Sequence, residues 1–201
     1  MEKPKEMFFL MRQVYATIFS LINKIQVKGD KYIKKMTSRQ LMTMIAIAHL
    51  PENKSSFNSI ARKLGTTKQS IKQIVRILEK KGYIVTLQSD KDKRAVNVEI
   101  TKNGKKAALE CSERGMYFFL DLFHEFSKEE MKILWKLLKK LYRFDGEKQD
   151  GFEEEVNVAE PGEAQMRAQE RVFNEFSKKR NKPKTQGDGM ISRFEKRSSR
   201  A

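Results

Sequence analysis

The sequence predicts a mainly α-helical fold that contains one small β-hairpin. Apolar residues recur every three or four positions over most of residues 6–143, a spacing typical of helices that bury one face. This period changes to two over residues 83–100, which indicates a pair of short strands. Gly65 and Gly82 interrupt the pattern where two short helices are expected to end.

Composition limits the classes of protein to which the chain can belong. Of its 201 residues, 39% are hydrophobic, which is enough for a folded core. Lys and Arg outnumber Asp and Glu by 42 to 26, for a net charge of +16, so a polyanionic partner is expected: nucleic acid first, an anionic membrane surface second. The single cysteine, Cys111, excludes an intramolecular disulfide framework and a multi-cysteine zinc site.

No apolar stretch is long enough to span a bilayer. The best candidate, residues 7–22, is interrupted by Arg12 and Gln13, and no small-residue cleavage site follows it. The sequence therefore predicts a soluble, reduced protein of the cytoplasm that does not bind a membrane.

The positive charge is confined to one part of the chain and suggests two regions. Residues 1–144 hold 30 Lys and Arg against 14 Asp and Glu, whereas residues 145–201 hold 12 of each. This tail is acidic over residues 145–170 and basic over residues 171–201. It lacks sustained apolar periodicity, so we expect most of it to be disordered, with a short helix over residues 164–177.

The first two helices are predicted from periodicity and end signals. A long amphipathic helix is expected over residues 6–27, ended by Gly29-Asp30. Thr37 or Ser38 then offers an N-cap for a second helix, whose run over residues 41–48 is apolar nearly all round and should therefore be central and buried. Residues 51–56 form a loop.

Two short helices joined by a tight turn follow. Residues 58–64 form the first, closed by Gly65, and residues 68–81 form the second, closed by Gly82. One stripe of the second helix is apolar: Ile71, Ile74, Val75 and Leu78. The opposite stripe is polar: Lys68, Gln69, Lys72, Gln73 and Arg76. A helix that turns Lys, Gln and Arg outward together, after a Gly-containing turn, is what reading the major groove of DNA requires.

A charged hairpin and two helices complete the first region. Residues 83–88 predict a strand, residues 96–100 its partner, and residues 89–95 the tip between them. A helix is expected from Thr101 to about His124, and Ser127 with Glu130 resembles a capping box for a last helix. That helix is expected to bury an apolar stripe: Met131, Leu134, Leu138 and Leu141.

Three segments of the chain resemble the multiple-antibiotic-resistance regulator (MarR) family. The first comprises residues 59–65 and the helix that ends at residues 78–84. The second is the hairpin tip, residues 90–95, which carries the family's Asp-x-Arg pattern. The third is residues 98–104, where a strand leads into a helix. In this order and spacing they are similar to a winged helix-turn-helix flanked by N- and C-terminal dimerisation helices. The likeness in helical layout covers about residues 6–143, and the tail lies outside it. We therefore expect a DNA-binding and dimerisation domain over residues 1–144.

The resemblance implies an obligate homodimer. It also implies that the protein represses nearby genes and that a ligand often relieves this repression. It places two recognition helices in successive major grooves and two wings in the flanking minor grooves. The residues give independent support for dimerisation. A lone winged helix needs neither a long apolar N-terminal helix nor the phenylalanine-rich run over residues 118–126, and so much peripheral apolar area favours a partner surface.

Candidate DNA contacts lie on the second helix of the pair and on the hairpin tip. Thr67 caps the helix, and that end suits a phosphate. Arg94 is expected to enter a narrow minor groove, oriented by an ion pair with Asp92. Gln73 stands where many family members carry a basic residue, so target sequences need not carry over. The full set of DNA-binding residues is Thr67, Lys68, Gln69, Ser70, Lys72, Gln73, Arg76, Lys91, Lys93 and Arg94.

The sequence gives little support for catalysis, metal binding or redox sensing. No nucleophile–base pair, paired acids or Gly-rich phosphate loop is present, so we expect no enzyme and no cofactor. Asp121, His124 and Glu125 share a helical face, but the only other histidine, His49, lies in a helix expected to be buried, so no metal site is predicted. Arg94 and a missing glycine exclude a calcium loop at the hairpin tip. Cys111 is interpreted as a small apolar residue that fills space in the core. The Phe and Met residues are expected to pack in the core or at the dimer interface rather than to line an effector pocket.

These observations predict a dimeric, sequence-specific DNA-binding transcription regulator, a repressor whose effector is unknown. Two alternatives remain open at this point. The chain could be a nonspecific nucleic-acid or chromosome-associated protein, to which the basic end of the tail adds phosphate contacts. It could also use its winged helix mainly as a protein-interaction module.

Overall fold

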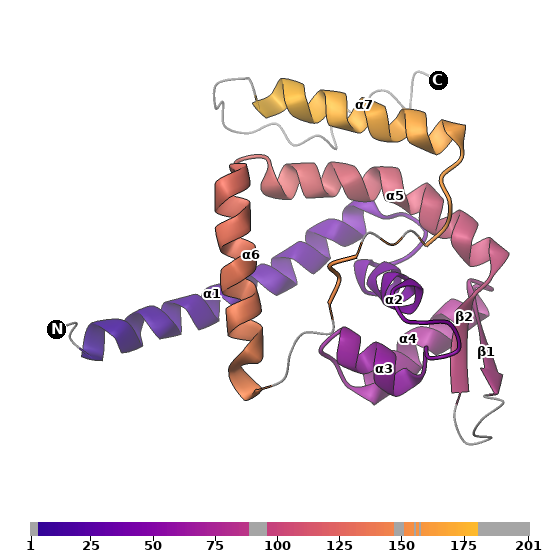
Figure 1. Cartoon of the computed structure of the whole chain (residues 1–201), viewed down its shortest axis with the longest axis horizontal. Coiled ribbons are helices and arrows are strands. Elements are labelled where there is room, and N and C mark those ends of the chain that lie inside the picture. The colour runs from indigo at the N-terminus through magenta and orange to yellow at the C-terminus, as the bar shows by residue number, and fades with distance from the viewer. Residues whose placement is uncertain (1–3, 89–95, 147–150, 155, 157, 181–201) are drawn as a thin grey trace.

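The computed structural model describes residues 4–88, 96–146, 151–154, 156 and 158–180. Helices predominate and one two-stranded antiparallel sheet is present, which confirms the predicted fold class (Figure 1). The elements, in chain order, are α1 (Pro4–Tyr32), α2 (Ser38–Ala48), α3 (Phe57–Lys63), α4 (Lys68–Lys80), β1 (Ile84–Gln88), β2 (Val96–Ile100), α5 (Lys102–Phe123), α6 (Lys128–Tyr142), the short 3-10 helix η1 (Arg143–Asp145) and α7 (Glu163–Arg180).

Helix α1 is longer than predicted, because Gly29 does not end it. The helix continues through Gly29 and Asp30 to Tyr32. Gly29 is buried, and a Cβ added there would lie 2.6 Å from the Ser38 hydroxyl oxygen and 3.3 Å from the Phe118 ring. This glycine therefore permits close approach of α2 and α5 rather than a left-handed turn.

Helix α2 forms the centre of the core, as predicted. Thr37 caps it in a capping box with Gln40, and the Asp30 carboxylate accepts a further hydrogen bond from the Ser38 amide at 2.6 Å. Met44 and Ala46 have no exposed surface. The exposed residues of the helix are Arg39 and Met42, which lie three positions apart and thus on one side. Figure 1 places α2 between α5 above and α3 below.

The two strands pair in the predicted antiparallel hairpin, with Ile84 opposite Ile100 and Gln88 opposite Val96. Val98 is buried against the core, as the alternation predicts. Asn97 is also buried, although the alternation places it on the outer face. Its side-chain oxygen accepts a hydrogen bond from the Ser55 amide at 2.8 Å, so the hairpin is tied to the loop before α3.

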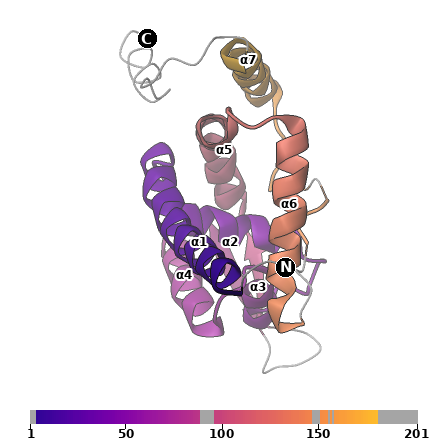
Figure 2. The same ribbon diagram turned by 90° about the vertical axis from the view of Figure 1, so that its left-hand side faces the viewer.

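Helix α6 begins as predicted but does not bury its apolar stripe. Ser127 and Glu130 form the predicted capping box. None of its residues is buried within the single chain, however, and Leu138 and Leu141 are about half exposed. The expected burial of Met131, Leu134, Leu138 and Leu141 is therefore not found within the single chain, in which α6 is a separate upright helix (Figure 2).

The described part of the tail contains one helix. Helix α7 confirms the helix expected over residues 164–177 and lies alongside α5 (Figures 1 and 2). Val172 is buried against Tyr117 of α5, Ala168 is also buried, and Arg171 pairs with Glu113 at 3.7 Å. The tail has too few apolar residues to fold alone, but α5 supplies the surface on which they are buried.

Within the described residues, no helix is both long and apolar enough to cross a lipid bilayer.

Candidate nucleic-acid interface

The turn between α3 and α4 fixes the direction of α4. Ser56 caps α3 by accepting a hydrogen bond from the Ser59 amide at 3.1 Å. Gly65 has a φ of 59°, the left-handed conformation that glycine adopts at least cost. The Thr66 amide then donates to the Ala61 carbonyl at 2.9 Å, which closes the turn. The pair α3–α4 is therefore a helix-turn-helix held by local bonds.

Thr67 caps α4, as predicted. Its hydroxyl accepts a hydrogen bond from the Ser70 amide at 3.1 Å, and the Ser70 hydroxyl lies 3.0 Å from the same oxygen. Thr67 is exposed, so this end of α4 is open to solvent. Unpaired amides and the positive end of the helix dipole make such an end favourable for a phosphate.

The two sides of α4 separate as the sequence predicts. Ile71 and Leu78 have no exposed surface, and Val75 is also buried, so these residues anchor the helix on the core. On the other side the exposed polar residues are Lys68, Gln69, Gln73 and Arg76. Ser70 and Lys72 are half-buried, so they lie nearer the edge of this surface.

Sequence reasoning missed one residue of this outward face. Ile77 is exposed, and it follows Gln73 by four positions, so the two side chains are neighbours on the helix. The outward position was available from helical spacing, but an isoleucine is normally assigned to the core. Apolar side chains on a reading helix contact the methyl group of thymine.

The hairpin lies beside the helix-turn-helix, at the end of the molecule away from α7 (Figure 1). Strand β1 contacts α4, and β2 contacts α2 and α3. The predicted contacts Lys91, Lys93 and Arg94, and the orienting residue Asp92, lie outside the described residues. Their roles stay predictions.

The groups that could have formed a metal site are engaged elsewhere. Asp121 accepts a hydrogen bond from the Tyr32 hydroxyl, and burial together with this carboxylate raises the Tyr32 pKa above its usual range. His124 Nδ1 lies 3.1 Å from the Asp121 carbonyl oxygen, and Nε2 of His49, the C-cap of α2, lies 3.1 Å from the Glu154 carbonyl oxygen. Among the described residues, no three His, Cys, Asp or Glu side chains are grouped as metal ligands.

Cys111 is buried in the core, in agreement with its interpretation as an apolar filler. Desolvation raises the pKa of its thiol, so the reactive thiolate is disfavoured.

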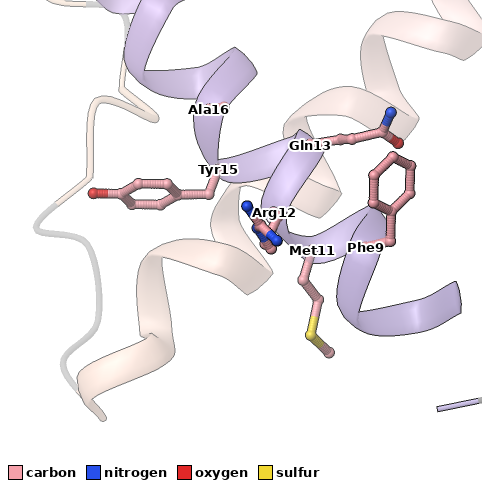
Figure 3. A pocket seen from close by; sticks show the side chains of 6 residues that line it. All are labelled: Phe9, Met11, Arg12, Gln13, Tyr15 and Ala16. Atoms are coloured by element: carbon pink, nitrogen blue, oxygen red, sulfur yellow. The ribbon is translucent and has the colours of Figure 1, made fainter. Parts of the chain in front are cut away.

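A hollow of about 540 Å³ lies along α1, but it is not an enclosed ligand pocket. All the side chains that line it come from α1 itself, and Figure 3 shows that Tyr15, Met11 and Phe9 point away from one another. The phenylalanine-rich run of α5 is divided between packing and exposure. The Phe118 ring packs on Tyr32 with centroids 5.2 Å apart, while Phe119 is exposed.

Comparison with known families agrees with this geometry. The model of the MarR family matches residues 34–95, which include the helix-turn-helix and β1. The sequence matches none of the curated proteins.

Several solved structures share the fold. A MarR/EmrR family transcriptional regulator from Acinetobacter sp. ADP1 is 26% identical, with a TM-score of 0.60 over 67% of this chain and 95% of that protein. MepR in the S. aureus MepR–DNA complex is 23% identical, with a TM-score of 0.58 over 64% of this chain and 96% of that protein. An organohalide-sensing transcriptional regulator with 2,4-dichlorophenol bound is 18% identical, with a TM-score of 0.60 over 73% of this chain and 86% of that protein. The Acinetobacter protein and the organohalide-sensing protein are both transcriptional regulators.

Proposed function

We propose that this chain is a transcription regulator of the MarR family that binds double-stranded DNA with sequence preference, as a homodimer. The match of residues 34–95 to the family's model supports this proposal. The observation that carries this proposal is the outward face of α4. It combines a solvent-open, capped N-terminus with exposed Gln and Arg side chains on a rigidly anchored helix. A structural relative, MepR, was solved on DNA.

Each residue of this face has a distinct task in the proposal. Gln69, Gln73 and Arg76 read base edges, because amide and guanidinium groups form paired hydrogen bonds with adenine and guanine. Thr67, Lys68, Ser70 and Lys72 contact phosphates and fix the register of α4 in the major groove. On the wing, Lys91 and Lys93 neutralise phosphates, and Arg94, oriented by Asp92, enters the minor groove.

Dimerisation is supported by apolar surface that the single chain leaves uncovered. Phe8, Tyr15 and Phe19 of α1 are more than 60% exposed, and Ile133, Trp135 and Leu137 of α6 are more than half exposed. Patches of this kind mark interfaces. A two-fold dimer presents two copies of α4, so we expect a pseudo-palindromic site with half-sites about 34–36 Å apart.

We further assign DNA binding and dimerisation to residues 1–144, and an appended tail to residues 145–201. The regulator is proposed to repress genes near its binding sites until a small molecule releases it. The relative with 2,4-dichlorophenol bound shows that this fold accommodates such a ligand in another protein. The first site to examine is the DNA upstream of the protein's own gene.

The proposal is tested by selecting bound duplexes from a random pool and measuring affinities at physiological salt. We expect one symmetric sequence to be enriched. Arg76→Ala and Gln73→Ala should each weaken it by ~1–3 kcal/mol and relax preference at particular bases. Lys91→Ala should instead weaken all duplexes alike and reduce the salt slope by about one unit. Arg167→Ala is the control, because Arg167 is an exposed cation on α7, away from the interface.

Two results would contradict this function. Equal affinity for random and selected duplexes, with a large loss on removal of residues 145–201, would indicate a nonspecific nucleic-acid-binding protein. Full regulatory activity of an Arg76→Ala, Arg94→Ala double variant in cells would indicate a protein-interaction module.

A further inference from the structure

The four residues Gly151, Phe152, Glu153 and Glu154 connect parts of the molecule that the helices leave apart. They lie beside the end of α2 and contact α3 and α6 (Figure 1). We call residues 151–154 the strap. It lies between the helix-turn-helix on one side and α6 on the other.

On the helix-turn-helix side, the strap contacts Lys63 and His49. Lys63 of α3 is only 6% exposed, and its ammonium donates to the Gly151 carbonyl at 2.6 Å. The same ammonium lies 5.0 Å from the centre of the Phe152 ring, a cation–π distance. His49, at the end of α2, meets that ring edge-on at 5.2 Å, and its Nε2 lies 3.1 Å from the Glu154 carbonyl oxygen.

On the α6 side, the strap forms an ion pair between Glu153 and Lys139. A second contact lies nearby, where Tyr142 reaches the turn that directs α4. A Cβ added at Gly65 would be 3.2 Å from the Tyr142 hydroxyl oxygen. Among the described elements, α6 has no extensive packing against α2, α3 or α4, and the strap contacts both sides.

We propose that the strap is a positioning element that fixes the orientation of the recognition helix α4 relative to α6. Phe152 is its anchor, because the ring is packed against the core and covers a buried ammonium of the helix-turn-helix. The consequence for function rests on the proposed DNA-binding dimer. If α6 contributes to the dimer interface, the strap sets the separation of the two copies of α4, and thus the half-site spacing that the protein prefers.

The size of the effect depends on the fraction of molecules that hold the competent orientation. A protein that holds the competent orientation only part of the time binds with an affinity reduced by that fraction. If Phe152→Ala leaves about a tenth of the molecules in the competent orientation, the apparent Kd for the selected duplex rises about tenfold. Duplexes with altered spacing lose little, because other orientations become available.

The DNA-free experiment measures the orientation directly. Spin labels at Glu79→Cys on α4 and Lys136→Cys on α6, in a Cys111→Ala background, report the distance between the two helices. Excess unlabelled protein keeps one labelled protomer per dimer. We expect one narrow distance distribution in the parent and in Phe173→Ala, whose ring is exposed on α7, and a broad one in Phe152→Ala. An equally narrow distribution in Phe152→Ala would overturn the proposal.

The DNA experiment tests the functional consequence with the full chain. The selected duplex is compared with versions that carry one or two extra base pairs between the half-sites. Phe152→Ala should lose about tenfold on the selected spacing and discriminate less between spacings. An equal loss at every spacing would indicate a merely structural role and would contradict the proposal. If the pool yields no selected duplex, the proposed function fails, and the spin-label distances still decide the role of the strap.

The ion pair provides a rescue. Lys139→Glu places two carboxylates together and should broaden the distance distribution. The double variant Lys139→Glu, Glu153→Lys restores opposite charges and should narrow it again. Failure of the double variant to recover would show that Glu153 has no part in positioning.

Discussion

At Gly104 the backbone of α5 lies so close to the residues that follow α4 that no side chain fits. A Cβ added there would be 1.9 Å from the Tyr83 carbonyl oxygen. The approach is held by two hydrogen bonds from Thr101, in which its amide donates to the Tyr83 carbonyl at 3.0 Å and its hydroxyl to the Gly82 carbonyl at 2.7 Å. The start of α5 is therefore tied to the residues that directly follow α4.

Gly104→Ala is expected to lower the free energy of unfolding by about 3 kcal/mol, because backbone rather than a flexible side chain must move. Gly115→Ala in the same helix is the matched control. A Cβ at Gly115 meets nothing within 4 Å, so that change should be neutral or stabilise by about 0.5–1 kcal/mol. Urea unfolding measures both. Equal stability of the two variants would refute the close approach at Gly104.

Cys111 is expected to be inert in the folded protein. It is 2% exposed and its pKa is raised by burial, so a thiol reagent must wait for the structure to open. Modification by a disulfide reagent should be at least about a hundredfold slower in native than in urea-unfolded protein, given an opening free energy of roughly 3 kcal/mol or more. The comparison is Glu110→Cys in a Cys111→Ala background, an exposed neighbour. Similar native rates at both positions would make Cys111 a candidate sensor after all.

At the scale of single elements, α7 folds on a surface that α5 supplies. Val172 has no exposed surface, whereas the adjacent Phe173 is 59% exposed. The helix therefore docks through a small apolar contact and leaves a larger side chain in solvent, the reverse of what residue size alone suggests.

Val172→Glu should release α7, because a carboxylate without a partner is costly to bury. Trypsin should then cleave after Arg167 and Arg171 at least about tenfold faster, since local opening governs access to these sites. Phe173→Glu is the control and should leave cleavage slow. If both variants are cleaved at the same rate, α7 does not depend on this contact.

At the scale of the whole molecule, the exposed faces of α1 and α6 predict self-association. Light scattering after size exclusion should give a mass about twice 23.6 kDa. Ile133→Asp with Leu137→Asp should weaken the dimer by ~3 kcal/mol or more and DNA affinity with it, because charges cannot replace buried apolar contacts. Lys136→Ala, on the same helix, should leave the dimer intact. A monomeric parent protein would refute the assignment of these faces.

The candidate site was largely predictable because its determinants are local. Thr67 caps α4 through the Ser70 amide, which is three residues away, and the left-handed turn depends on Gly65 itself. The two sides of α4 follow from the helical period. The same holds for the capping box at Ser127. The exposure of Ile77 was not predicted. Helical spacing places this residue on the outward face, but its hydrophobic side chain favours the core.

The sequence by itself determined the order of the elements, their caps and the polar face of α4, since each depends on residues within a few positions of one another. The tertiary structure alone decided that α1 continues through Gly29, that Asn97 is buried, that α6 stays uncovered and that part of the tail docks. It also brought Lys63 into contact with Gly151, which lies 88 positions later in the chain. These features depend on surfaces supplied by distant parts of the chain, and no local pattern records which surfaces will meet.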